Sequence, residues 1–119
     1  MREHVLCQEL PEPPANIEIM PPDPNPNATT RERFAAHTAE QQCADCHVLI
    51  DPLRFGFENY DGVGRWRSEE NGLFVDSSGE VVGSGESLLD GPFDGAVELS
   101  YKLADSELVQ DCIAEQWFT

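Results

Sequence analysis

Two cysteines and a histidine stand next to one another in the run Cys43-Ala44-Asp45-Cys46-His47. Thiols at this spacing can add across the two vinyl groups of a haem, and the adjacent histidine can then coordinate the iron. The three side chains have to be neighbours for that geometry to close. The motif therefore predicts one covalently bound haem c per chain, attached through Cys43 and Cys46, with His47 as the proximal axial iron ligand.

Two other kinds of site use closely spaced cysteines. A redox-active C-x-x-C pair is typical of a βαβ pattern, which this sequence does not show. A zinc site needs two further ligands, and the remaining cysteines, Cys7 and Cys112, lie far from the motif in the sequence. Both alternatives stay open, and haem attachment is the favoured interpretation.

Cys7 and Cys112 form a pair near the two ends of the chain. Haem attachment takes place outside the cytoplasm, where disulfides persist, so we expect these two residues to be joined. A cross-link over that length would stabilise the fold by about 4–5 kcal/mol in the chain-entropy model. The alternative is two separate buried thiols. Cysteine usage thus predicts a periplasmic, cell-surface or extracellular protein.

The sixth position on the iron has no obvious ligand, because no Met or His follows His47. The upstream candidates are His4, Met20 and His37. On an unbroken helix, the ten residues from His37 to His47 would separate their Cα atoms by about 15 Å. His37 could bind the iron only if the chain broke between about 38 and 43; otherwise it would bond a neighbour or a haem propionate. Met20 and an open or water-bound site are the further alternatives.

Two more sets of side chains could assist a cofactor. The first set follows a glycine turn and consists of Arg65, Trp66 and Arg67. We expect it to contact the haem propionates, with ordinary surface charge as the alternative. The second set is acidic and consists of Asp51, Glu58 and Asp61. Its carboxylates could hold calcium, but they lack EF-hand spacing, which favours plain surface carboxylates.

The chain is strongly acidic, with 23 Asp and Glu residues against 7 Lys and Arg and a formal net charge of −16. Such a charge repels phosphate backbones and anionic membranes, which disfavours nucleic-acid and lipid partners. The expected partner is a redox protein with a basic surface, or neighbouring chains of a larger assembly. No stretch approaches the roughly 18 apolar residues of a transmembrane helix, so no membrane insertion is expected. No signal peptide is recognisable either, so we expect the chain to be a piece of a longer exported precursor.

The elements that must position these residues are mostly helical. Residues 1–28 hold most of the prolines and are expected to be extended. Thr29 and Glu32 have capping-box spacing, which predicts a helix over 30–42 that runs towards the motif. The remaining expected elements are a short helix over 53–60, a hairpin over 73–82 that turns at 76–79, and helices over 94–104 and 106–118.

The expected fold is mostly α, a small c-type cytochrome-like helical domain with a short β-hairpin and a long Pro-rich N-terminal segment. Its parts would be the segment 1–28, a haem-binding core over 29–70, and the hairpin with two packed helices over 71–119.

A longer pattern surrounds the motif. It reads His37, Cys43-x-x-Cys46-His47, Ile50-Asp51-Pro52-Leu53-x-Phe55-Gly56-Phe57-Glu58-Asn59-Tyr60-Asp61, Gly64 and Trp66-Arg67. This pattern resembles the cytochrome-c-like modules of large planctomycete and myxobacterial secreted proteins, which are largely domains of unknown function. Further segments resemble the short domain that follows such modules, and they are Val75-Asp76-x-Ser78-Gly79, Gly91-Pro92-Phe93-x-Gly95, Glu98-Leu99, Cys112 and Gln116-Trp117-Phe118.

The resemblance implies a haem-binding role for Cys43, Cys46 and His47. A histidine at the position of His37 belongs to the pattern, which favours a haem-related role for it as well. Relatives extend beyond both ends of this chain. One residue departs from the pattern: Arg54 stands where glycine is usual, and it would alter the backbone or bring a charge to the haem edge.

The favoured function is electron transfer by a monohaem c-type domain, in which the cofactor supplies the redox chemistry. A haem enzyme with peroxidase-like activity at an open distal site is one alternative. A haem that serves as a structural staple in a larger extracellular assembly is the other.

Overall fold

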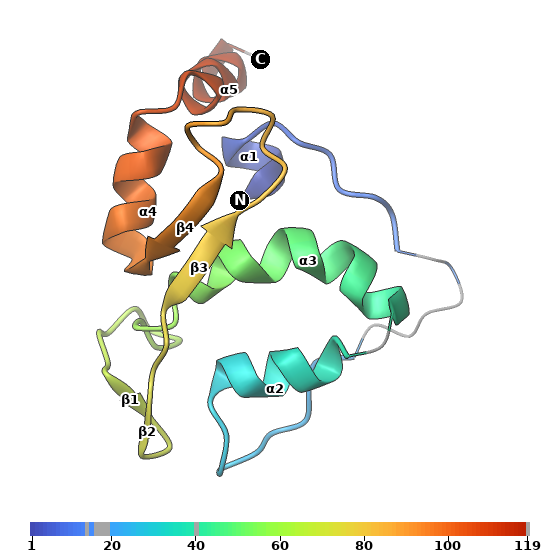
Figure 1. The fold of residues 1–119 in the computed structure, drawn as a ribbon, viewed down its shortest axis with the longest axis vertical. Coiled ribbons are helices and arrows are strands. Elements are labelled where there is room, and N and C mark those ends of the chain that lie inside the picture. The colour runs from blue at the N-terminus through green and yellow to red at the C-terminus, as the bar shows by residue number, and fades with distance from the viewer. Residues whose placement is uncertain (14, 16–19, 40, 119) are drawn as a thin grey trace.

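The structure is a computed structural model that describes residues 1–13, 15, 20–39 and 41–118. Over these residues the chain forms five helices and two antiparallel sheets of two strands each (Figure 1). The helices are α1 (Arg2–Val5), α2 (Thr30–His37), α3 (Gln41–Phe55), α4 (Gly95–Ala104) and α5 (Glu107–Phe118). The strands are β1 (Glu69–Glu70), β2 (Leu73–Phe74), β3 (Ser78–Val81) and β4 (Gly91–Asp94).

The mostly α fold class is wrong, because the chain has a mixed α/β fold with two strand pairs. The first pair, β1 with β2, is closed by Asn71 and Gly72, which both have positive φ as a tight hairpin turn requires. The second pair joins β3 to β4 across an intervening loop. The expected hairpin over 73–82 is therefore absent from the described chain, since its two halves pair with other partners.

The helices around the motif also differ from expectation. The helix expected over 30–42 is two helices, since α2 ends at His37 and α3 begins at Gln41. Pro52 does not end α3, which continues to Phe55, and the expected helix over 53–60 is replaced by turns. The segment expected to be extended over 1–28 instead begins with α1.

The apolar core lies away from the motif. The β3–β4 sheet lies between α3 and α4, and α1 packs against α5 (Figure 1). The core residues are Leu6, Leu53, Val81, Leu89, Phe93, Leu99 and Val109. Arg2 anchors α1 by donating to the carbonyls of Leu49 and Val82, at 2.5 Å each. Within the described residues, no helix has the length and apolarity needed to cross a membrane.

Close packing of β3 on α3 requires a glycine at position 79. A Cβ there would clash with the Pro52 carbonyl and the Phe93 ring, both held by the core. We expect Gly79→Ala to lower the free energy of unfolding by about 1–3 kcal/mol, as overpacking does. Urea denaturation measures this, and Gly62→Ala is the control because no atom lies within 4 Å of its added Cβ. Equal losses in the two variants would contradict the packing argument.

Candidate haem site

The motif lies in the first half of α3. Cys43, Cys46 and His47 share one side of the helix, because residues three and four apart are neighbours on its surface. Both cysteines are free thiols and half-buried. The structure thus presents two accessible thiols beside a histidine, as thioether attachment requires.

Asp51 fixes the ring of His47. The Nδ1 atom of His47 lies 3.1 Å from Oδ2 of Asp51, one helical turn further along α3. A carboxylate can only accept a hydrogen bond, so the ring proton is on Nδ1 and the lone pair is on Nε2. Asp51 is buried, and a buried carboxylate behind a histidine is the usual support of a metal ligand. The sequence pattern predicts a calcium ligand or a surface carboxylate at Asp51, and the signal that indicates its contact with the histidine is the four-residue spacing from His47.

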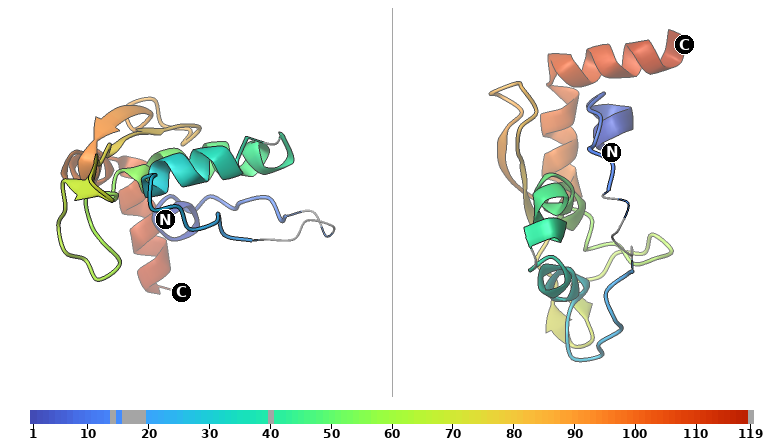
Figure 2. Two further views of the ribbon diagram at one scale, coloured as in Figure 1. Left: turned by 90° about the horizontal axis from the view of Figure 1, so that it is seen from below. Right: turned by 90° about the vertical axis from the view of Figure 1, so that its right-hand side faces the viewer.

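The chain break that a second histidine ligand requires is present. Thr38 ends α2: its backbone N–H bonds back to Phe34 and Ala36, and its hydroxyl donates to the Phe34 carbonyl at 3.0 Å. The chain then reverses, and α2 lies beside α3 at the end of the molecule away from α5 (Figures 1 and 2). Neither proline nor glycine is involved.

The reversal brings His37 next to His47. Their ring centroids are 6.0 Å apart and their planes are inclined by 75°. Two imidazoles that bind one metal ion from opposite sides have centroids about 6 Å apart, because each metal–nitrogen bond is about 2 Å long and each nitrogen lies about 1 Å from its ring centre. By this distance, His37 and His47 are the residues that would hold one iron between them.

A cleft of about 280 Å³ opens between α2 and α3 beside His47. Its lining is mostly apolar or small and consists of Ala35, Thr38, Ala44, His47, Val48, Asp51, Pro52 and Phe55. No residue of α2, all of whose positions are described, is buried. The cleft is at the small end of ligand sites and can enclose only part of a macrocycle. Of the residues that would hold a haem, His47 lines this cleft, whereas His37 lines a neighbouring pocket of about 470 Å³ and the two thiols line neither. The chemistry of the donor set, two free thiols and two histidines, is what fits a covalently held, partly exposed haem.

Comparison with known families places this site inside a recognised domain. Residues 1–70, more than half of the chain, match the model of the family described as PSCyt3, protein of unknown function (DUF1588). The chain belongs to the PSCyt3 family. No curated protein and no solved structure matched. The match covers the motif, both histidines and the cleft, and it assigns none of them a function.

A ladder of ion pairs runs through the PSCyt3 segment behind the cleft. Its successive members are Asp51, Arg54, Glu58, Arg67 and Glu70, with nitrogen–oxygen distances of 3.8, 4.0, 3.5 and 3.2 Å. Glu70 then accepts hydrogen bonds from the backbone and hydroxyl of Thr30, at 2.6 and 2.7 Å. The ladder ties the first turn of α2 to α3 through the β1 strand.

Two carboxylates of this ladder have opposite pKa shifts. Burial raises the pKa of Glu58, and the nearby guanidinium groups of Arg54 and Arg67 offset this only in part. Burial would raise the pKa of Glu70 as well, but the hydrogen bonds from Thr30 and the charge of Arg67 outweigh it and lower the pKa. The charged carboxylate of Glu70 therefore holds the first turn of α2.

Acidification is expected to loosen this hold. Because the pKa of Glu70 is lower in the folded state, its stabilisation is complete above the ordinary value of 4.5 and is lost as pH falls below that value. Urea denaturation between pH 6.5 and pH 3.5 should show a smaller loss of stability in Glu70→Gln than in the wild type. The pKa of Glu58 is raised in the folded state, so its protonation at low pH would stabilise the fold. Glu58 therefore cannot cause the loss of stability expected on acidification. The control is Glu69→Gln at the exposed neighbouring position, which should keep the wild-type pH dependence.

The basic and aromatic residues expected at the propionates do not line the cleft, and their contact with a haem stays a prediction. Arg65 is exposed and pairs with Asp61 at 3.1 Å, and Arg67 belongs to the ladder. Trp66 is 63% exposed. Among the described residues that line the cleft, none of the three is found. Met20 is also exposed, at 58%, and only His37 is shown in ring contact with His47.

The residues expected for calcium are not gathered around a common point. Asp51 contacts His47, Glu58 lies between two arginines, and Asp61 accepts from the backbone and side chain of Arg65. In the described part of the chain, no group of three or more His, Cys, Asp or Glu residues could hold a metal ion. Arg54, which was expected to alter the backbone or bring a charge to the haem edge, lies within α3, and its guanidinium pairs with Asp51 and Glu58.

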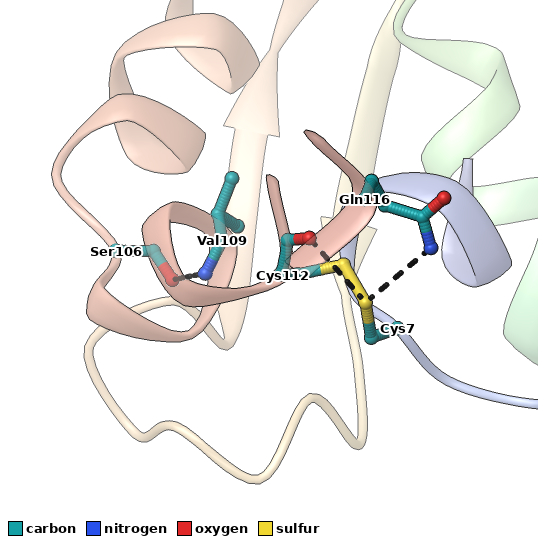
Figure 3. The surroundings of a disulfide bond; sticks show 5 residues. All are labelled: Cys7, Ser106, Val109, Cys112 and Gln116. Atoms are coloured by element: carbon teal, nitrogen blue, oxygen red, sulfur yellow. Dashed lines mark hydrogen bonds between the residues drawn. A yellow bond between two sulfur atoms is a disulfide. The ribbon is translucent and has the colours of Figure 1, made fainter. Parts of the chain in front are cut away.

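Cys7 and Cys112 are joined in a disulfide, with their sulfur atoms 2.12 Å apart (Figure 3). The bond ties the second residue after α1 to the middle of α5, and Gln116 lies 3.9 Å from the Cys7 sulfur. Ser106 caps the start of α5 by accepting from the Val109 N–H at 3.2 Å (Figure 3). Because both sulfur atoms are committed to this bond, they do not complete a zinc site with Cys43 and Cys46.

Proposed function

We propose that this chain is a monohaem c-type cytochrome domain that transfers electrons through a haem attached at Cys43 and Cys46. The observation that carries the proposal is the pair of facing histidines, 6.0 Å apart, beside two free thiols on α3. When bound, the haem would supply one-electron redox chemistry. The resemblance of this PSCyt3 segment to the cytochrome-c-like modules of planctomycete and myxobacterial secreted proteins supports the same proposal.

Each residue of the candidate site would have a separate role in holding the haem. Cys43 and Cys46 hold the cofactor, and His47, oriented by Asp51, is the proximal ligand. His37 would be the second histidine to hold the iron, which favours electron transfer over peroxidase-like chemistry because a substrate would then have no open site. The small, open cleft would leave part of the cofactor accessible to a partner.

The disulfide and the net charge support a cellular location and a kind of partner for the domain. A disulfide persists outside the cytoplasm, which supports a periplasmic, cell-surface or extracellular location. The net charge of −16 favours a redox partner with a basic surface, or neighbouring chains of a larger assembly.

The test is an optical spectrum of the protein produced in a bacterial periplasm with cytochrome maturation enzymes. A low-spin, six-coordinate spectrum in both oxidation states, with little carbon monoxide binding, is expected. A five-coordinate spectrum with full carbon monoxide binding would favour the peroxidase-like alternative. A haem that cannot be reduced reversibly would favour a structural staple, and absence of bound haem would overturn the proposal.

A further inference from the structure

Arg54 contacts one neighbour of each candidate histidine ligand, Asp51 beside His47 and Phe34 beside His37. We propose that Arg54 is a positioning residue that couples the rings of His37 and His47. This inference rests on the proposed function, because it concerns the two residues that would bind the iron.

The first arm of the coupling runs to His47 through Asp51. The two carboxylate oxygens of Asp51 face different partners: Oδ2 lies 3.1 Å from Nδ1 of His47, and Oδ1 lies 3.8 Å from Nε of Arg54. The guanidinium therefore holds the buried carboxylate through one oxygen while the other oxygen contacts His47. This restrains the partner that sets the ring orientation of His47.

The second arm runs to His37 through Phe34. The guanidinium carbon of Arg54 lies 3.5 Å from the centroid of the Phe34 ring, in contact with the aromatic face. Phe34 and His37 are three residues apart on α2, and their rings meet edge to face with centroids 6.5 Å apart. Arg54 therefore fixes the aromatic ring against which His37 rests.

The contacts of Arg54 suit a rigid planar cation. Its Nε and Nη2 atoms are buried and have no hydrogen-bond partner among the described residues, and its ion pairs with Asp51 and Glu58 are 3.8 and 4.0 Å long. Hydrogen bonds therefore do not fix its position. Stacking does, on Phe34 and more distantly on Phe55, whose centroid is 5.2 Å away. A lysine would keep the charge and lose the planar stacking.

Besides the direct contact of the two rings, Arg54 provides the described side-chain link that reaches the neighbours of both histidines. The ladder behind the cleft fastens the first turn of α2 at Thr30, two turns before His37. Helix α2 ends at His37 and α3 begins at Gln41, and the sequence between them contains no proline or glycine. Arg31 links α2 to α3 at Phe55, near the start of α2. Arg54 is the cation that contacts Phe34, one turn before His37.

The experiment compares Arg54→Gln, Arg54→Lys and Phe34→Leu with wild type, all produced with covalent haem. Lys102→Gln, which removes one positive charge from α4, is the matched control. In Arg54→Gln and Phe34→Leu we expect a severalfold rise in the fraction that binds carbon monoxide, and a shift of the electron paramagnetic resonance signal from low to high spin. Arg54→Lys should retain the His47 arm and show a smaller rise, and Lys102→Gln should match the wild type.

Haem-free protein supplies a second readout. Cross-peaks between the rings of Phe34, His37 and His47 in nuclear Overhauser spectra should be present in the wild type and weakened in Arg54→Gln. If Arg54→Gln does not fold, Phe34→Leu decides, since it breaks the same link without removing a charge.

The outcomes separate the two proposals. Wild-type spin state and carbon monoxide binding in both Arg54→Gln and Phe34→Leu, with haem attached, would overturn the role of Arg54 and leave the cytochrome proposal standing. Absence of covalent haem in the wild type would overturn both.

Discussion

Replacing Cys43 and Cys46 together with alanine is expected to abolish covalent haem attachment, so that denatured protein shows no haem absorbance. The reason is chemical: the thioether carbons are bonded to these two sulfur atoms, and among the cysteines of the described chain they are the ones not held in a disulfide. Each single variant keeps one thiol and should keep one thioether. The reduced pyridine complex of such a haem retains one vinyl group and absorbs at a longer wavelength, which distinguishes one bond from two.

The matched control for this experiment is the pair Cys7→Ala with Cys112→Ala. It also removes two cysteines but leaves the motif intact, so it should retain haem through denaturation. Attachment is scored on unfolded protein, and the control therefore does not depend on the stability of the fold. Equal haem content in the two double variants would contradict attachment at the motif.

The proximal half of the candidate site could be predicted from the sequence because it is local. Cys43, Cys46 and His47 lie within five positions, and any helix places them on one side. The distal half depends on whether the chain breaks after His37. The sequence at that break contains no proline or glycine that would predict the end of a helix. The break arises because the Thr38 hydroxyl competes for the Phe34 carbonyl, a weak local signal that acquires weight only when α2 can lie against α3.

The strand pairing was missed for a different reason. Asn71-Gly72 is a strong hairpin signal, but the strands it joins are only two residues long, and β1 consists of two glutamates, which an apolar pattern does not reveal. β4 contains Gly91 and Pro92, which read as a turn. Proline is tolerated there because the sheet has only two strands, so each strand has a free edge. β4 forms a strand because it pairs with β3, which is distant in the sequence, and local sequence patterns do not predict such a pairing.

Replacing Cys7 and Cys112 together with alanine is expected to cost the largest share of stability, about 4–5 kcal/mol in the chain-entropy model. The sulfur atoms connect residues 105 positions apart, so the bond restrains nearly the whole unfolded chain. The folded state depends on it at one place in particular. Helix α1 has four residues, too few to be stable alone, and it is held by the Arg2 hydrogen bonds, by buried Leu6 and by this cross-link to α5.

Urea denaturation of haem-free protein measures the effect. The midpoint should fall and the slope should rise, because an unfolded chain without the cross-link exposes more surface. Cys43→Ala with Cys46→Ala is the control, since it removes two thiols that lie outside the apolar core and should leave the midpoint near that of the wild type. The two double variants thus have opposite expected results: one loses haem and keeps its stability, and the other keeps haem and loses stability. A similar fall of the midpoint in haem-free Cys43→Ala with Cys46→Ala would contradict the role given to the disulfide.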